Sequence, residues 1–161
     1  MTLSVGDRIP DATLFVKGES GIESRATSDL FAGRKIVLVG MPGAFTPTCH
    51  RNHLPGFIEN RDVILEKGVD EIAVITTNDA HVMSAWAEAT GAKDRITFLS
   101  DGNAEFVRKA GLDYENLARG MGVRCKRFAA IVDDGVVTAI SVEDVPGQAV
   151  ASSAARILEQ L

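Results

Sequence analysis

Apolar and polar positions along the chain predict buried strands that alternate with short helices. Residues 35–41 contain four consecutive apolar residues, the pattern of a parallel strand that is covered on both faces. Asp134-Gly135 lies between two β-rich runs and is a strong signal for a two-residue hairpin turn. The other predicted strands are 11–16, 22–25, 70–77, 96–99, 127–132 and 136–142. The first two and the last two of these are expected to form hairpins.

Helices are predicted between most of these strands, at 28–31, 46–67, 78–90, 103–110 and 152–161. Asn78-Asp79 caps one of them, and Ser152 or Ser153 caps the last. Pro55-Gly56 lies inside the long second helix, so we expect a kink or break near His53. The order β-α-β-α-β-α-β-β-α predicts an α/β fold, with a mixed central sheet flanked by helices. We expect residues 1–161 to form a single domain.

The loop after the first central strand carries the most informative chemistry. Thr46 is a good N-cap and Pro47 suits the first helical position, so the helix is expected to begin there. Cys49 then falls in the first turn, where free backbone N–H groups and the helix dipole favour an anion. The thiolate is the nucleophilic form of cysteine, so this position predicts a reactive thiol. A reactive thiol after the first central strand of such a sheet is typical of a thioredoxin-like architecture.

Composition excludes several other classes of function. The net charge is −5, and no run of Lys or Arg is long enough to predict binding to nucleic acid or to an anionic membrane. The two cysteines, Cys49 and Cys125, are too few for a disulfide framework. The first residues lack a signal-peptide pattern, and no apolar run approaches the roughly 20 residues of a membrane helix. A reducing compartment, the cytoplasm, is the expected location.

Two segments around the cysteine resemble the active-site segment of peroxiredoxins. These are Pro42-Gly43-Ala44-Phe45-Thr46-Pro47-Thr48-Cys49 and His53-Leu54-Pro55-Gly56-Phe57. Asn78-Asp79 and the downstream Arg124-x-x-Arg127-Phe128 are similar to the same family. The resemblance spans nearly the whole chain. It is greatest to the branch that contains the plant type II enzymes and the mammalian atypical two-cysteine enzyme.

The resemblance implies that Cys49 is the peroxidatic cysteine and that Pro42, Thr46 and Arg127 complete its site. It also implies reduction of hydrogen peroxide and alkyl hydroperoxides at the expense of thiols, without a cofactor, in what is often a compact homodimer. An Arg127 guanidinium could polarise the peroxide, and the Thr46 hydroxyl could donate to the sulfur or accept the peroxide proton. Pro42 has no N–H and could wall the site against water. Arg124 is expected to be solvated.

The chain departs from its relatives at the positions of the resolving cysteine. Mammalian enzymes of this branch carry it near the C-terminus, where this chain reads Gln148-Ala149-Val150-Ala151-Ser152-Ser153, and plant enzymes often carry it at the position of Val74. This favours a one-cysteine cycle in which an external thiol, either glutathione with glutaredoxin or thioredoxin, reduces Cys49. Cys125 is two residues before Arg127 and would face the same side of a strand. We nevertheless expect it to have no catalytic role.

Several alternatives stay open from the sequence. Cys125 could serve as a resolving cysteine in a thioredoxin-dependent cycle. The chain could instead be a thiol–disulfide exchange protein, or a redox-sensing or chaperone-like module without enzymatic activity. Cys49-His50-x-x-His53 suggests a metal site only weakly, because it offers three ligands and no second cluster. Both histidines are expected on the helix surface or at a dimer contact.

Overall fold

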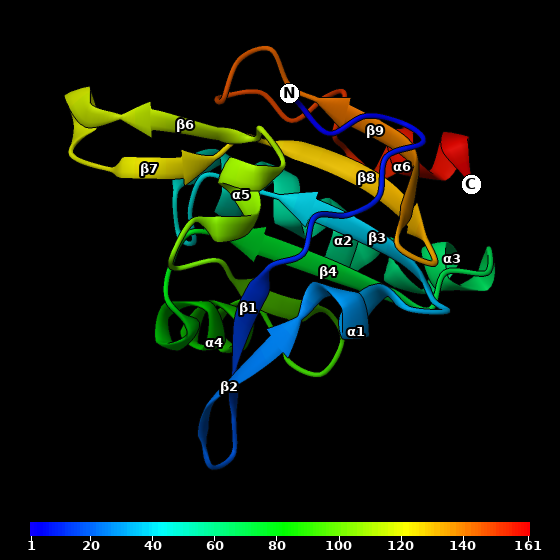
Figure 1. Cartoon of the computed structure of the whole chain (residues 1–161), viewed down its shortest axis with the longest axis horizontal. Helices are drawn as coiled ribbons and strands as arrows, with labels where there is room; N and C mark the ends of the chain where they lie inside the picture. The colour runs from blue at the N-terminus through cyan, green and yellow to red at the C-terminus, as the bar shows by residue number, and fades with distance from the viewer.

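A seven-stranded mixed sheet forms the centre of the protein, which is described for residues 1–161 by a computed structural model (Figure 1). Across the sheet the order is β2-β1-β5-β4-β3-β8-β9. Strands β3, β4 and β5 run parallel to one another, and the other pairings are antiparallel. The strands are β1 (Thr13–Gly18), β2 (Gly21–Ala26), β3 (Lys35–Gly40), β4 (Glu71–Thr76), β5 (Thr97–Ser100), β8 (Phe128–Asp133) and β9 (Val136–Val142). The predicted mixed sheet is confirmed.

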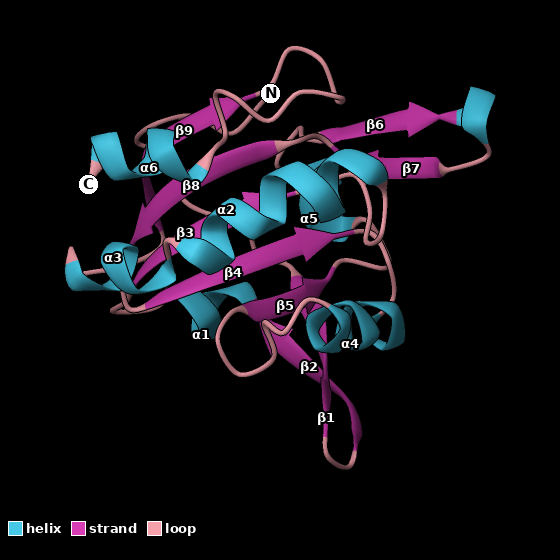
Figure 2. Ribbon diagram, turned by 180° about the vertical axis from the view of Figure 1, so that it is seen from behind, coloured by secondary structure: helices cyan, strands magenta, loops and turns pink.

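Helices cover both faces of the sheet, as the views from the two sides show (Figures 1 and 2). One face packs against α2 (Leu54–Glu59), α3 (Arg61–Glu66), α4 (Ala80–Ala89) and α6 (Ala154–Gln160), and the other against α1 (Thr27–Phe31) and α5 (Glu105–Lys109). Two hydrophobic cores result. In β3, Val37 and Val39 belong to the first core, whereas Ile36 and Leu38 belong to the second. The continuous apolar run of this strand therefore reflects burial on both sides.

The long helix predicted after β3 is divided into several pieces. It begins at Pro47 as predicted, but a π-helical turn, Cys49–His53, precedes α2, and the chain bends again at Asn60 before α3. The Leu54 N–H donates to the Cys49 carbonyl, five residues back. Pro55 cannot donate a backbone hydrogen bond, so the ladder has to be irregular here. The predicted irregularity near His53 is confirmed, whereas the bend at Asn60 was not predicted.

A second, two-stranded sheet is absent from the sequence prediction. It consists of β6 (Asp113–Asn116) and β7 (Gly122–Cys125), joined through a 3₁₀ turn, Leu117–Arg119. The hairpin projects from the main sheet (Figure 1). Its first strand reads Asp-Tyr-Glu-Asn and has no buried residue. The strand therefore lacks the apolar alternation on which strand prediction depends.

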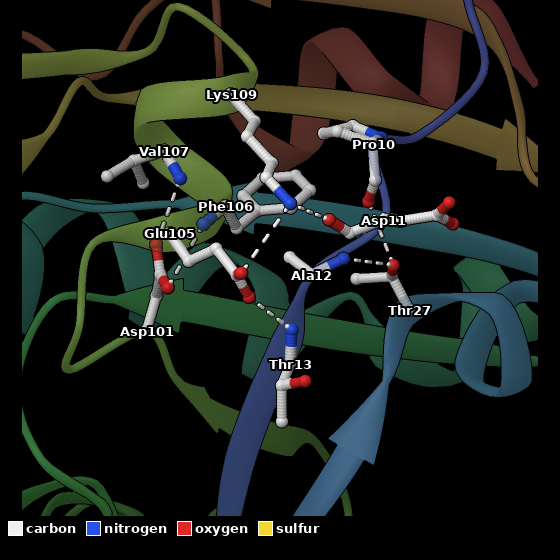
Figure 3. Close-up of polar contacts among 10 residues, drawn as sticks. All are labelled: Pro10, Asp11, Ala12, Thr13, Thr27, Asp101, Glu105, Phe106, Val107 and Lys109. Atoms are coloured by element: carbon white, nitrogen blue, oxygen red, sulfur yellow. Dashed lines mark hydrogen bonds and ion pairs between the residues drawn. The ribbon is translucent and has the colours of Figure 1, made fainter.

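Polar side chains fix α5 against the start of β1 (Figure 3). The buried Asp101 carboxylate accepts hydrogen bonds from backbone N–H groups in the first turn of α5. The Glu105 carboxylate accepts from the Thr13 N–H at 2.7 Å, and the Lys109 ammonium donates to the Asp11 carbonyl at 2.6 Å. The helix is shorter than the predicted 103–110, because Ala104 before it has a left-handed conformation with φ of 56°.

Short-range predictions agree well with the structure. The Asp79 side chain caps α4 by accepting from the Val82 N–H at 2.9 Å, and Ser153 rather than Ser152 caps α6. Asp134 and Gly135 form the two-residue turn between β8 and β9, with φ of 47° and 79°. Both values are positive, as the predicted hairpin turn requires. None of the helices has both the length and the apolar character that crossing a membrane demands.

Candidate active site

The loop that carries the predicted nucleophile lies where the carboxyl ends of β3 and β4 meet. The Met41 N–H donates to the Ile75 carbonyl at 3.0 Å, which extends the pairing of the two strands into the loop. The Asn78 side chain then accepts from the Ala44 N–H and from the Thr76 hydroxyl, each at 2.8 Å. The loop is therefore held at Met41 by the end of β4 and at Ala44 by the Asn78 side chain.

Cys49 and Arg127, which are 78 residues apart in the sequence, are in direct contact. The guanidinium Nη2 donates a hydrogen bond to the Cys49 Sγ at 3.1 Å. Both residues are buried, with 0% and 3% of their surface exposed. The other groups that Arg127 contacts are a carbonyl and an imidazole, so no carboxylate neutralises the guanidinium. The positive charge of the guanidinium therefore faces the sulfur with no neighbouring anion to offset it.

Thr46 lies at the predicted helix start, but its side chain does not cap the helix. Its hydroxyl donates to the Gly43 carbonyl at 2.7 Å, across the tight loop, whereas its own carbonyl accepts from the His50 N–H at 2.9 Å. The prediction of a side-chain N-cap is therefore wrong. The competing acceptor, Gly43, is local, and short polar side chains often bond to such nearby backbone groups.

Pro42 is buried, and its carbonyl is held by an arginine that the sequence analysis assigned to solvent. The Arg124 Nη1 donates to the Pro42 carbonyl at 3.2 Å, and its Nε donates to the Met121 carbonyl at 2.7 Å. Arg124 is half-buried, so the expectation that it is solvated is wrong. It joins the β6–β7 hairpin to the loop before Cys49.

A pocket of about 410 Å³ opens above these residues. Its walls contain two arginines and no acidic residue, and they consist of Pro42, Thr46, Pro47, Thr48, Tyr114, Asn116, Arg119, Met121, Arg127, Pro146 and Gly147. Burial raises the pKa of Tyr114, and the negative charge of the Cys49 thiolate raises it further. Cys49 itself does not line the pocket. Three of the four predicted site residues, Pro42, Thr46 and Arg127, therefore border one cavity, with Cys49 in contact with the last.

His53 contacts Arg127 and does not lie where the sequence predicted. It is buried, with 1% of its surface exposed, and is not on the helix surface as expected. The Arg127 Nη1 donates to its Nδ1 at 3.0 Å, while its Nε2–H donates to the Ser152 carbonyl at 2.8 Å. Burial, aided by the Arg127 charge and opposed by the bond to Ser152, lowers the pKa of His53 to about 4. The imidazole is therefore neutral at pH 7.

The spacing of His53 was the signal that could have located it. It follows Cys49 by four residues, which places both side chains near one face of a helix. The third member of the suspected metal cluster, His50, is engaged elsewhere, since its Nδ1 accepts from the Trp86 Nε1–H at 2.9 Å. Both ring nitrogens of His53 are engaged, by Arg127 and by Ser152, and no group of three or more His, Cys, Asp or Glu side chains is arranged to hold a metal ion.

Cys125 does not join the site. It is fully buried in the core on the opposite face of the sheet from Cys49. Burial raises the pKa of its thiol well above the usual range, and its Sγ–H donates to the Lys126 carbonyl at 3.1 Å. The expectation that it faces the same side as Arg127 is wrong. That rule applies within one strand, whereas Cys125 ends β7 and Arg127 lies in the link to β8.

Comparison with known proteins decides the family. A family model described as Redoxin matches residues 4–158. The chain is 46% identical to the chloroplastic peroxiredoxin-2E-2 of rice, over 99% of this chain and 73% of that protein. The chain is a peroxiredoxin of the type II branch. It is also 41% identical to peroxiredoxin-2B of Arabidopsis thaliana, over 99% of this chain and 98% of that one.

The peroxiredoxin fold agrees with solved structures as well. The reduced Prx3 of Vibrio vulnificus in complex with hydrogen peroxide superposes with a TM-score of 0.94 at 43% identity, covering 99% of each chain. The predicted thioredoxin-like fold is thereby confirmed. The protein is a thiol-dependent peroxidase.

Proposed function

We propose that Cys49 is the peroxidatic cysteine of this peroxidase. Its thiolate attacks one oxygen of a hydroperoxide, the O–O bond breaks, and Cys49 becomes a sulfenic acid. The alcohol oxygen leaves with the electron pair of that bond and takes up a proton, giving an alcohol, or water from hydrogen peroxide. The observation that carries this assignment is the 3.1 Å contact between the Arg127 Nη2 and the Cys49 Sγ.

Ionisation of the sulfur supplies only a small part of the acceleration. A cysteine of ordinary pKa is about 3% thiolate at pH 7, so full ionisation gains about 30-fold at most, or roughly 2 kcal/mol. The rest has to come from donors directed at the charge that develops on the leaving oxygen. Arg127 is suited to this role because it lines the pocket and already donates to the sulfur.

Thr46 and Pro42 shape the approach of the peroxide. The Thr46 hydroxyl proton is engaged with the Gly43 carbonyl, so the Thr46 oxygen is left as an acceptor for the peroxide O–H. Thr46 and Pro42 border the same pocket as Arg127. Pro42 offers no N–H to water on that wall. We assign Thr46 to orienting the peroxide and Pro42 to limiting hydration.

We further propose a one-cysteine cycle in which glutathione, with glutaredoxin, reduces the sulfenic acid. Two features support it. Cys125 lies on the opposite face of the sheet from Cys49. In addition, the pocket wall carries Arg119 and Arg127 but no carboxylate, which suits a small anionic thiol such as glutathione. The thiol displaces the hydroxyl group from the Cys49 sulfur, giving water and a mixed disulfide, which glutaredoxin then reduces.

Steady-state turnover of hydrogen peroxide tests both parts of the proposal. We expect turnover with glutathione and glutaredoxin in the wild type and unchanged turnover in Cys125→Ser. Cys49→Ser, which preserves size, should abolish it. Turnover that persists in Cys49→Ser would refute the assignment of the nucleophile. Turnover that requires thioredoxin and is lost in Cys125→Ser would refute the one-cysteine cycle and make Cys125 the resolving residue.

A further inference from the structure

Arg127 is a buried cation, and one side chain other than Cys49 holds its guanidinium. Its Nη2 donates to the Cys49 sulfur, its Nε to the Pro146 carbonyl at 3.0 Å, and its Nη1 to the His53 Nδ1 at 3.0 Å. A guanidinium can only donate, so His53 has to present an unprotonated Nδ1. The proton of the neutral ring is then on Nε2, where the Ser152 carbonyl accepts it at 2.8 Å.

The Ser152 carbonyl is in turn fixed by a carboxylate. One Glu143 oxygen accepts both from the Ser152 N–H and from the Ser152 hydroxyl, each at 2.6 Å. Burial tends to raise the pKa of Glu143, but these hydrogen bonds outweigh it and lower the pKa. Glu143 is therefore ionised at neutral pH. It holds Ser152, which is completely buried, in one orientation.

These contacts close on themselves. The Glu143 N–H donates to the main-chain carbonyl of Arg127 at 2.9 Å. From Arg127 the hydrogen bonds therefore run to Glu143 through the main chain, then to Ser152, then to His53, and return to the guanidinium. A closed ring restricts each member more than an open chain would, because moving one bond strains the others. It links the residue after β9 to the π-helical turn that carries Cys49.

We propose that His53, Ser152 and Glu143 are positioning residues of the peroxidase, which hold the Arg127 guanidinium with its Nη2 directed at the Cys49 sulfur. The inference rests on the proposed function, in which Arg127 must reach both the sulfur and the bound peroxide. Displacing a group by about 1 Å can lower a rate about 100-fold. Without His53, the Nη1 group loses its hydrogen-bond partner, and only the Pro146 carbonyl and the sulfur itself still hold the guanidinium.

The test compares two reactions of Cys49. Peroxide reduction needs a positioned guanidinium, whereas alkylation by iodoacetamide at high pH needs only an ionised, accessible sulfur. In His53→Phe we expect the rate constant for peroxide to fall by about 30- to 100-fold and that for alkylation by less than about 3-fold. His50→Phe is the matched control, since it makes the same replacement in the same turn without touching Arg127. It should stay within about 3-fold of the wild type in both reactions.

A double-mutant cycle separates positioning from a general effect on the fold. If His53 acts through Arg127, then adding His53→Phe to Arg127→Met should slow peroxide reduction by less than about 2-fold further. Equal losses in both backgrounds, or a His53→Phe enzyme within about 3-fold of the wild type, would overturn the inference. If His53→Phe does not fold, Glu143→Gln provides the same comparison, because it removes the charge that holds Ser152. A wild type that fails to react with peroxide would instead refute the proposed function.

Discussion

Replacing Arg127 by methionine separates the two tasks that we propose for its guanidinium. The change keeps a flexible, unbranched stem but removes the charge and the donor that lies 3.1 Å from the Cys49 sulfur. The first task is to favour the anionic sulfur. The second is to stabilise the charge that moves onto the leaving oxygen. Only the first can be restored by raising the pH.

The two tasks have different magnitudes. Losing all help with ionisation slows the reaction at pH 7 by about 30-fold at most, because an ordinary cysteine is about 3% ionised there. Losing a donor aimed at a developing oxyanion typically costs about 10²- to 10³-fold. We therefore expect Arg127→Met to be about 10³- to 10⁴-fold slower at pH 7. At pH 9.5 the deficit should shrink to about 10²- to 10³-fold.

The single tryptophan, Trp86, provides the assay. Its Nε1–H donates to His50, the residue after Cys49, so its fluorescence should report oxidation of the sulfur. Stopped-flow mixing with excess hydrogen peroxide at pH 7 and at pH 9.5 gives the second-order rate constants. If Arg127→Met reaches the wild-type rate at pH 9.5, then Arg127 acts only by ionising the thiol and the reasoning fails. A rate unchanged even at pH 7 would show that Arg127 has no role.

Three further predictions concern stability and are measured by urea unfolding. Gly40→Ala should destabilise the protein by at least about 2 kcal/mol, because the new Cβ would overlap the Phe128 ring. Gly147→Ala is the control and should be nearly neutral, because a Cβ there meets no atom within 4 Å; equal urea midpoints for the two variants would contradict this. The pKa of His53 is about 4 in the folded protein and 6.5 in the unfolded chain, so the free energy of unfolding should be highest above pH 6.5 and fall by about 3 kcal/mol as the pH drops through 4. If His53→Gln keeps the same pH dependence, another group is responsible for it. Asp79→Ala should cost about 1 kcal/mol by removing the cap of α4, and no change would show that the cap contributes nothing.

The fold could be predicted wherever the determinants were local. The buried run of β3, the Asp134-Gly135 turn and the Asp79 cap each depend on a few neighbouring residues, and all three are found as predicted. The β6–β7 hairpin was missed because β6 has no apolar alternation and β7 is only four residues long, so neither strand carries a pattern long enough to predict it. The predicted contact of Arg127 with Cys49 came from family resemblance, since nothing local joins residues 78 positions apart.

The burial of His53 and the isolation of Cys125 could not be read from the sequence for a different reason. His53 is buried because the segment after β9 covers it and offers it the Ser152 carbonyl, which is a long-range event. Cys125 faces away from Arg127 because the chain passes from the small sheet to the large one between them. Residues two apart face the same side only within one strand, and the sequence did not show that β7 ends at Cys125.

The contacts of Arg127 hold its guanidinium in place without pairing it with a carboxylate. A carboxylate placed against the guanidinium would bind it more strongly, but it would also neutralise the charge that the sulfur needs. The structure uses neutral acceptors instead, a carbonyl from Pro146 and the Nδ1 of His53. The nearest carboxylate in the ring, Glu143, is separated from the guanidinium by two hydrogen-bonded residues and is engaged with Ser152. Arg127 is thus held in one orientation while its positive charge stays directed at Cys49, which is the combination that the proposed mechanism requires.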